Sequence, residues 1–333
     1  MTWGSLWSGG AIPKDLYLEI AKGNVPGHSI VHKFGKNPDV DNAITFETVW
    51  NGGNAYTGFN ATAAETLEVF SDDAADIGTV LSSGTATGGS STTIEDSGAT
   101  FVSDGVALGD VCINDTGLYH GIVESVTETE VIVYTFNEGS TPQPGDSYRI
   151  VTQASTGAPV CRLSFMLDSD YVETAEYIVL NGATAVDTVG TYIRQSRAST
   201  AGGDNQGQIT SRQKTTTANI MMVMPAGYNS TMIVAYTIPR GHRGYILGWS
   251  SSLAGKVNAN VDSRFRQRER LCAFQVKEEL SSISSGSSYI PRSYKAPKNS
   301  LSEMSDIEVQ SSSDTNNTSV VAEFELLLIQ DGF

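Results

Sequence analysis

The stretch that decides the fold of this chain runs from Tyr177 to Trp249. It contains apolar and β-branched runs separated by segments with glycine, proline, asparagine or aspartate: YIVLNG (177–182), TYIRQSRAST (191–200), QITSRQ (208–213), TANIMMVMPAG (217–227), TMIVAYTIPRG (231–241) and YILGW (245–249). Such runs, joined by short turn segments, are typical of consecutive β-strands. No apolar stripe with a helical period interrupts them. The stretch therefore predicts an all-β region.

The composition of the whole chain agrees with this prediction. Only 17% of its 333 residues are charged, and serine, threonine, glycine and asparagine make up much of the remainder. Disordered chains are usually rich in charge, whereas many short strands and tight turns suit a chain of this kind. The length allows two or three domains.

Charge, cysteine content and the first residues restrict the function. A formal net charge of −16 argues against a general nucleic-acid binder, which needs a basic surface. Cys112, Cys161 and Cys272 are odd in number and far apart, so they predict no disulfide framework and favour assembly in a reducing cytoplasm. We expect no signal peptide, since MTWGSLWSGG lacks a basic start before an apolar core, and no membrane span.

Residues 1–24 are predicted to form an N-terminal arm with one short helix. Pro13 suits the first turn of PKDLYLEIAKG (13–23), and Gly23 suits its end. Trp3 and Trp7 precede this helix on a lead rich in glycine and serine. Such aromatic side chains dock either on the chain's own core or on a neighbouring subunit, so both residues are candidates for a subunit interface.

The remaining strand runs predict three further units. Residues 78–152 are interpreted as a small β-barrel module, inserted at a loop of a β-sandwich host formed by residues 25–77 and 153–215. Residues 216–333 are predicted to form a C-terminal β-sandwich or jelly roll, whose last strand carries the apolar run LLLI (326–329) and should be central in its sheet. Insertions at loops are well tolerated, because loop-closure entropy grows slowly with loop length.

Several segments together resemble a family of tailed-bacteriophage virion proteins, described as structural, decoration, head-fibre or neck-associated proteins. The segments are VHKFGKNPDVD (31–41), ETVWNGGNAYTGF (47–59), YIVLNGATAV (177–186), QSRASTAGGDNQGQIT (195–210), MPAGYNSTMIVAYTIPRGHRGYILGW (224–249), FQVKEEL (274–280) and SYKAPKNSLSEMSDIEV (293–309). The resemblance covers most of the chain outside residues 78–152. It implies a virion component and no catalytic residues.

Arginines at alternate positions form the clearest candidate site. If RFRQRERL (264–271) is a strand, its period of two places Arg264, Arg266, Arg268 and Arg270 on one face. Like charges in such a row repel each other unless acidic groups pair with them. Two interpretations stay open: a match within this chain, for example to Glu269, Glu278 and Glu279, or a ladder that binds an acidic neighbouring subunit through bidentate pairs.

The inserted module carries a second candidate. Tyr119 and His120 are predicted to lie at a turn of the module, in an exposed loop that could face a receptor. Aromatic side chains that could provide a sugar-binding platform, with core packing as the alternative, are Tyr56, Phe59, Tyr119, Tyr134 and Tyr148.

No motif predicts catalysis, a cofactor or a metal. The chain has no Gly-x-Ser-x-Gly elbow, phosphate-binding loop or His-Glu-x-x-His pattern, and only four histidines. His28 and His32 fall on a predicted strand and lie too far apart for one metal. The acidic groups around Asp72 and Asp168 could hold calcium, but solvated turns are the simpler interpretation.

The sequence therefore predicts a non-enzymatic structural protein of a bacteriophage virion, assembled in the bacterial cytoplasm. Its expected partners are copies of itself, with a trimer first and a hexamer or larger ring next, and the major capsid or neck and portal-associated proteins; nucleic acid and membranes are not expected. The alternative is a tail- or head-fibre protein that recognises a host surface glycan. A polysaccharide depolymerase is a third, more distant interpretation.

Overall fold

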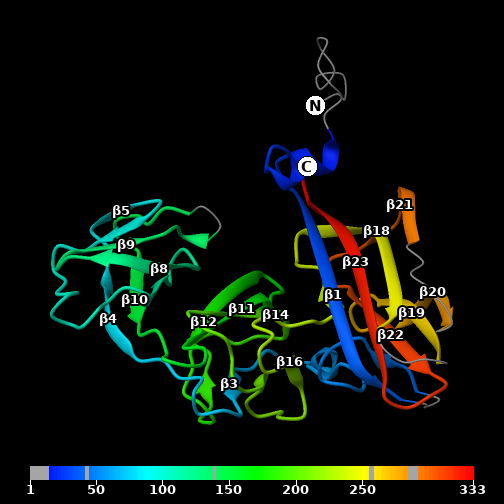
Figure 1. Cartoon of the computed structure of the whole chain (residues 1–333). Coiled ribbons are helices and arrows are strands. Elements are labelled where there is room, and N and C mark those ends of the chain that lie inside the picture. Colours follow the sequence, from blue (N-terminus) through cyan, green and yellow to red (C-terminus); the bar gives the residue numbers. More distant parts are fainter. Residues whose placement is uncertain (1–14, 42–44, 138–139, 255–258, 284–291) are drawn as a thin grey trace.

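The chain folds into three β bodies that lie side by side (Figure 1). The computed structural model describes residues 15–41, 45–137, 140–254, 259–283 and 292–333. Two of the bodies are sandwiches of antiparallel sheets and the third is a barrel. The predicted all-β class is confirmed.

The largest body is a sandwich of two sheets. The first sheet has the order β1 (His28–Val40), β23 (Thr318–Gln330), β18 (His242–Leu253) and β21 (Arg292–Leu301). The second has the order β17 (Ala235–Thr237), β22 (Asp306–Ser313), β19 (Asn260–Arg268) and β20 (Gln275–Ile283), and the short β2 (Glu47–Thr48) also pairs with β22. Their inner faces share one core, which includes Val31, Trp249, Phe265, Ile307 and Phe324.

The strand order of this sandwich is that of a jelly roll. Numbered along the chain, its eight main strands are β1, β17, β18, β19, β20, β21, β22 and β23. The two sheets then have the orders 1-8-3-6 and 2-7-4-5, which are those of two interlocked Greek keys. β23, which carries LLLI, pairs with β1 on one side and with β18 on the other. Its predicted central position is confirmed.

The second body is a smaller sandwich built from the middle of the chain. One sheet has the order β12 (Glu173–Val179), β11 (Val160–Leu167) and β14 (Arg194–Ala201); the other has the order β13 (Val186–Asp187), β3 (Leu67–Ser71), β15 (Ile209–Gln213) and β16 (Ile220–Met224). Between them lies an apolar core that includes Leu67, Leu163, Met166, Ile209 and Met222. The two sheets bury their apolar faces against each other, as sandwiches do.

The third body is a closed barrel. Its sheet has the order β4 (Val80–Thr85), β10 (Ser147–Val151), β7 (Val111–Asn114), β8 (Tyr119–Val126), β9 (Glu130–Val133), β6 (Thr93–Glu95) and β5 (Gly88–Ser90). β4 and β5 are consecutive parts of one strand, separated only by residues 86–87, so the first and last members of the sheet meet. Closure leaves the barrel without an open edge around a core that includes Ile94, Phe101 and Tyr148.

Along the sequence, each body is inserted within the next one, although the three bodies lie side by side in space. All barrel strands fall within the predicted range 78–152, between β3 and β11 of the small sandwich. The small sandwich in turn lies between the first and second strands of the jelly roll. Three segments therefore belong elsewhere than the predicted ranges placed them. β1 pairs with β23 and β2 pairs with β22, both in the jelly roll, and β16 pairs with β15 in the small sandwich. Pairing between residues 291 positions apart has no signal in the local sequence.

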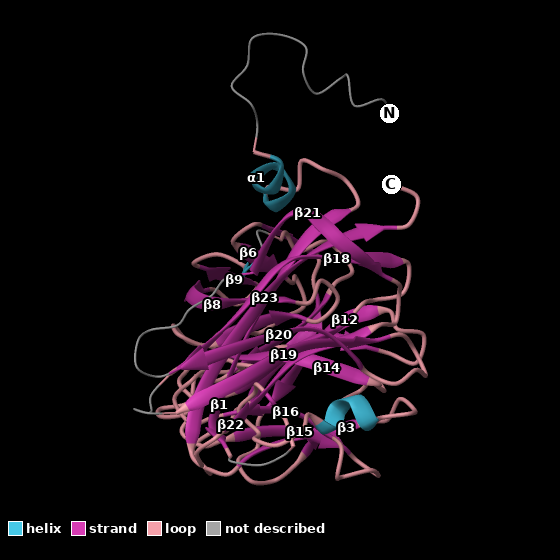
Figure 2. Cartoon of the chain, turned by 90° about the vertical axis from the view of Figure 1, so that its right-hand side faces the viewer, coloured by secondary structure: helices cyan, strands magenta, loops and turns pink. Residues whose placement is uncertain are grey.

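A short helix lies at the end of the jelly roll near the last residues (Figure 2). α1 (Leu16–Ala21) begins after Asp15, whose side chain accepts a hydrogen bond from the main-chain nitrogen of Tyr17 at 2.9 Å. A helix is therefore present within the predicted range 13–23, although it is shorter, and it buries Ile20. Pro13, predicted for its first turn, lies outside the described residues. A 3-10 turn, η2 (Thr57–Asn60), packs between the jelly roll and the small sandwich.

Candidate functional site

The predicted arginine row exists on β19, but it is shorter than expected. Arg264, Arg266 and Arg268 alternate with the core residues Val261 and Phe265, as the period of two requires. β19 ends at Arg268, so Arg270 lies in the following turn. There its guanidinium lies 5.5 Å from the ring centroid of Tyr171.

Each arginine of the row has a polar partner directly opposite on β22. Arg264 Nη2 donates to Gln310 Oε1 at 2.7 Å, and Arg266 Nε donates to Glu308 Oε1 at 2.7 Å. Arg268 Nε donates to Asp306 Oδ2 at 2.8 Å. The register of the two strands sets these three pairs. β22 thus carries a matching row of acceptors at alternate positions. These acceptors pair with the arginines across the two strands and offset the repulsion between like charges.

Aromatic rings cover the outer side of the same row. The guanidinium of Arg264 lies 4.0 Å from the ring centroid of Phe46, and that of Arg266 lies 4.1 Å from the centroid of Phe274. The guanidinium of Arg268 lies 4.6 Å from the same Phe274 centroid. Cation–π contacts of this kind add to the ion pairs where water is partly excluded.

These contacts bear on the two interpretations of the arginine row. The pairing partners are Asp306, Glu308 and Gln310, and not the Glu269, Glu278 and Glu279 named from the sequence. The three arginines are therefore matched within the chain, and a contact with another subunit stays a prediction. A variant that removes them would alter the fold before it tested any interface.

Asp306 also joins the jelly roll to the small sandwich. Arg194 of β14 donates to both carboxylate oxygens of Asp306, with Nε and Nη2 each at 3.1 Å. Thr237 Oγ1 donates to Oδ1 at 2.5 Å, so Arg194, Thr237 and Arg268 together supply donors to both carboxylate oxygens of Asp306. Both partners of the Arg194 pair are almost completely buried. The joint between the two sandwiches is therefore polar and tightly satisfied at this point.

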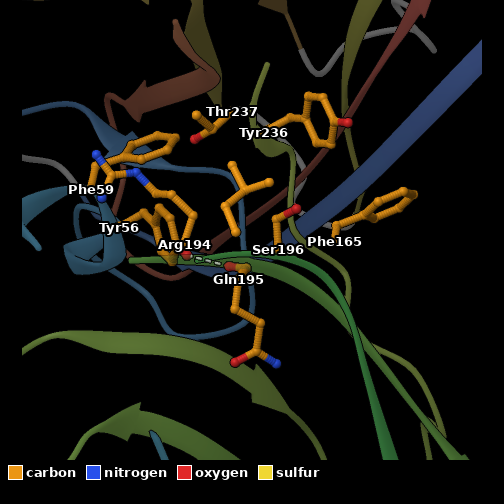
Figure 3. Close-up of a pocket in the computed structure, with 9 residues that line it drawn as sticks. Tyr56, Phe59, Phe165, Arg194, Gln195, Ser196, Tyr236 and Thr237 are labelled. Atoms are coloured by element: carbon orange, nitrogen blue, oxygen red, sulfur yellow. Dashed lines mark hydrogen bonds between the residues drawn. The ribbon is translucent and has the colours of Figure 1, made fainter. Parts of the chain in front are cut away.

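A small cavity lies beside this pair, between β14 and β17 (Figure 3). Its volume of ≈ 10 Å³ offers room for about one water molecule. The Tyr56 hydroxyl donates to the main-chain oxygen of Gln195 at 2.6 Å, and the Gln195 side chain points away from the other residues drawn (Figure 3). Ser196 Oγ, which belongs to the lining, is buried without a hydrogen-bond partner. The cavity is too small to hold an organic substrate.

Lys33 of β1 approaches the same joint from the jelly roll. Its side chain is buried, and its Nζ donates to the main-chain oxygen of Ser196. The Nζ also lies 5.4 Å from the ring centroid of Phe165. Burial, reinforced by the nearby Arg197, lowers the pKa of Lys33 to about 7, against a smaller opposing effect of Glu173. Its hydrogen-bond acceptor is thus a neutral carbonyl, in contrast to the carboxylate that Arg194 meets.

The prediction of an exposed receptor-facing loop at Tyr119 is wrong. The turn ends at Leu118, which has a positive φ of 59°, so Tyr119 already begins β8 and points into the barrel. There it packs edge-on against Phe136 at 5.1 Å between ring centroids, and it accepts a hydrogen bond from Asn114 at 2.8 Å. His120 points the other way and lies 3.0 Å from the Tyr177 hydroxyl of the small sandwich, at the seam between the two bodies.

Of the other residues predicted to lie at the surface, most of those the structure describes are buried. Among the five aromatic side chains considered for a sugar platform, Tyr56, Phe59, Tyr119 and Tyr148 are buried and Tyr134 is exposed. Trp3 and Trp7, the remaining interface candidates, lie outside the described residues.

Asp76, one of the acidic side chains considered for calcium, is held by main-chain donors. Asp76 is fully buried and accepts hydrogen bonds from the main-chain nitrogens of Ala158, Gln206 and Gly207 at 2.8–2.9 Å. Such donors satisfy the carboxylate and tie three loops together. Within the described ranges, no three histidine, cysteine, aspartate or glutamate side chains gather in a way that could hold a metal ion. No helix in the described part of the chain is long and apolar enough to cross a membrane.

Two exposed features of the jelly roll remain. At the end that carries α1, the side chains of Leu16, Tyr17 and Leu18 are about half exposed, and Phe333 is 68% exposed with its ring against the main chain of Gly27. The second feature is the outer face of the first sheet, whose rows of side chains run across β1, β23 and β18.

Comparisons with known proteins do not assign a family. No family model matches the chain, and no curated protein matches it. Among solved structures, the subviral particle of VP2 of infectious bursal disease virus aligns with a TM-score of 0.21 at 10% identity, over 97% of this chain and 75% of that one. The Gx strain of the same virus aligns with a TM-score of 0.20 at 9% identity, over 97% and 74%. Scores this low establish no shared fold.

Proposed function

We propose that this chain is a non-enzymatic structural protein of a tailed-bacteriophage virion, which decorates or projects from the capsid or neck and acts by assembling with copies of itself. The observation that carries the proposal is the jelly-roll strand order, 1-8-3-6 against 2-7-4-5. Jelly rolls recur in viral capsid proteins, and also in lectins and cupins. Since a fold hosts many functions, the resemblance of the sequence segments to phage virion proteins is what selects among them.

The exposed apolar end supports an anchoring role for this part of the molecule. Leu16, Tyr17 and Leu18 occupy consecutive positions of α1, so a six-residue helix leaves three large apolar side chains in contact with water. Phe333 adds a fourth at the same end. Soluble monomers rarely leave such side chains contiguous, and contiguous ones mark contact surfaces. We expect this end to contact the capsid or neck.

Immunogold labelling of intact particles, read by electron microscopy, tests the proposal. Label over the head would support decoration of the capsid, and label confined to the neck would support a collar protein. Absence of label on particles from a lysate that contains the protein would refute the virion assignment. Replacement of Leu16 and Leu18 by serine tests the anchor separately: the variant should fold but be lost from purified particles.

A further inference from the structure

The outer face of the first jelly-roll sheet carries a row with histidines and a lysine beside a row with two glutamates. We define it by the side chains of β1, β23 and β18 that point away from the core. On β1 the outward positions are His28, Ile30, His32, Phe34 and Lys36; none is acidic. Opposite them on β23 stand Ile329, Leu327, Glu325, Glu323 and Val321. A row with two histidines and one lysine therefore adjoins a row with two glutamates, with apolar pairs at one end.

These side chains are accessible. His32 keeps 53% of its side-chain surface although it pairs with Glu323 at 3.3 Å, and Phe34 is 41% exposed. Glu325 is also exposed. In Figure 1 no other element crosses in front of β1 and β23. On the far side of β23, β18 presents Gly248 and Ser250, which add little bulk beside the acidic row.

We propose that this outer face binds the same face of a second copy of the chain about a twofold axis. The inference deepens the proposed function and rests on it, since it names the surface through which copies associate. An axis parallel to the strands and between β1 and β23 places each copy's β1 over the other's β23. His32 then lies opposite Glu325 of the second copy, and Ile30 lies opposite Leu327.

Complementary polar side chains favour a second copy as the occupant. An isologous contact places a surface against itself, so a polar patch of this kind matches itself when its hydrogen-bond donors lie in a row beside its acceptors. On the outer face the imidazole of His32 lies opposite Glu325, and Lys36 lies diagonal to Glu323. Each copy can therefore set the row of His32 against the glutamate row of the other. The strands also give enough length: 13 residues at about 3.3 Å each make β1 roughly 40 Å long.

The test begins with the oligomeric state of the intact protein, measured by sedimentation equilibrium. Glu325→Lys should weaken self-association at least about ten-fold, because both symmetry-related contacts between His32 and Glu325 then lose their carboxylate acceptor. The exchanged variant His32→Glu with Glu325→Lys should recover most of the affinity. Glu124→Lys, the same charge change at an exposed position on the barrel, is the matched control and should associate like the wild type.

Cross-linking locates the contact independently. In a Cys272→Ser background, which removes the exposed native thiol, His32→Cys protein is mixed with Glu325→Cys protein and treated with a short bis-maleimide. The proposal predicts a covalent dimer from the mixture. Self-association that persists in Glu325→Lys, with no cross-link in the mixture, would overturn the inference and leave assembly through another surface. A monomer that nevertheless labels particles would also overturn it, whereas a monomer absent from particles would overturn the proposed function as well.

Discussion

Two basic side chains, Arg194 and Lys33, are buried at strand β14 of the small sandwich against different partners. On β14, Arg194 pairs with the carboxylate of Asp306, while two residues further on the main-chain oxygen of Ser196 accepts a hydrogen bond from Lys33. Both charges are buried at the same joint. The first is matched by a full opposite charge, and the second is held by a neutral carbonyl. Burial by itself thus says little about what a charge contributes; the partner decides it.

Removal of Asp306 should have the largest effect of any single change at this joint. Asp306→Ala leaves Arg194 buried without its carboxylate and also deprives Arg268 of its partner. Loss of one partner of a buried pair costs about 3–5 kcal/mol of unfolding free energy. Urea denaturation followed by circular dichroism measures it. Asp39→Ala, at an exposed position on β1, serves as the control. A loss for Asp306→Ala no larger than that control's would contradict the role assigned to the pair.

The arginine row offers the same comparison along a single strand. Arg266→Ala leaves the buried Glu308 without its cationic partner, and burial already raises the pKa of this carboxyl. We expect the unfolding free energy to fall by about 2–4 kcal/mol. Arg264→Ala removes the hydrogen-bond partner of a neutral amide, Gln310, so the unfolding free energy should fall by only about 1 kcal/mol. Both variants lose one guanidinium over one aromatic ring. The difference between their denaturation midpoints therefore isolates the partner's charge, and equal midpoints would show that it does not matter.

Lys33 should behave in the opposite sense, because its charge has no carboxylate to meet. Its pKa of about 7 in the folded chain lies below the ordinary 10.5, so between these values the unfolded chain binds the extra proton. Stability must then rise as pH increases from about 7 towards 10.5. Lys33→Met should stabilise the protein at pH 7 by about 1–3 kcal/mol, after the cost of leaving the Ser196 oxygen unpaired.

Denaturation at a series of pH values measures this prediction. The advantage of Lys33→Met over the wild type should shrink as the pH rises, since the wild-type amine becomes neutral in both states. Lys36→Met, three residues along the same strand on the outer face, is the control and should show no such convergence. An advantage that stayed constant with pH would place its origin in packing and not in the charge.

The sequence predicted what repeats locally and missed what depends on distant pairing. The strand runs, the central position of LLLI and the common face of Arg264, Arg266 and Arg268 all follow from a period of two. The partners on β22 carry the same period, as Asp306, Glu308 and Gln310. Nothing local says that these two rows share a register across about forty residues. The predicted exposure of Tyr119 was wrong for a related reason. A turn displaced by one residue reverses the side to which every following side chain points.

The ion pair between Arg240 and Asp170 lies at the surface and should contribute the least to stability. Arg240 Nη1 lies 3.1 Å from Asp170 Oδ1, which is as close as Arg194 lies to Asp306, but both side chains are more than half exposed. Water already solvates each charge, and ordering two mobile side chains offsets most of the attraction. Arg240→Ala should therefore change the unfolding free energy by no more than about 0.5 kcal/mol. Added salt should abolish even that difference, whereas it should leave the effect of Asp306→Ala almost intact, because buried pairs are little screened. If both variants respond to salt alike, then the distance between the atoms, and not their burial, sets the strength of these pairs.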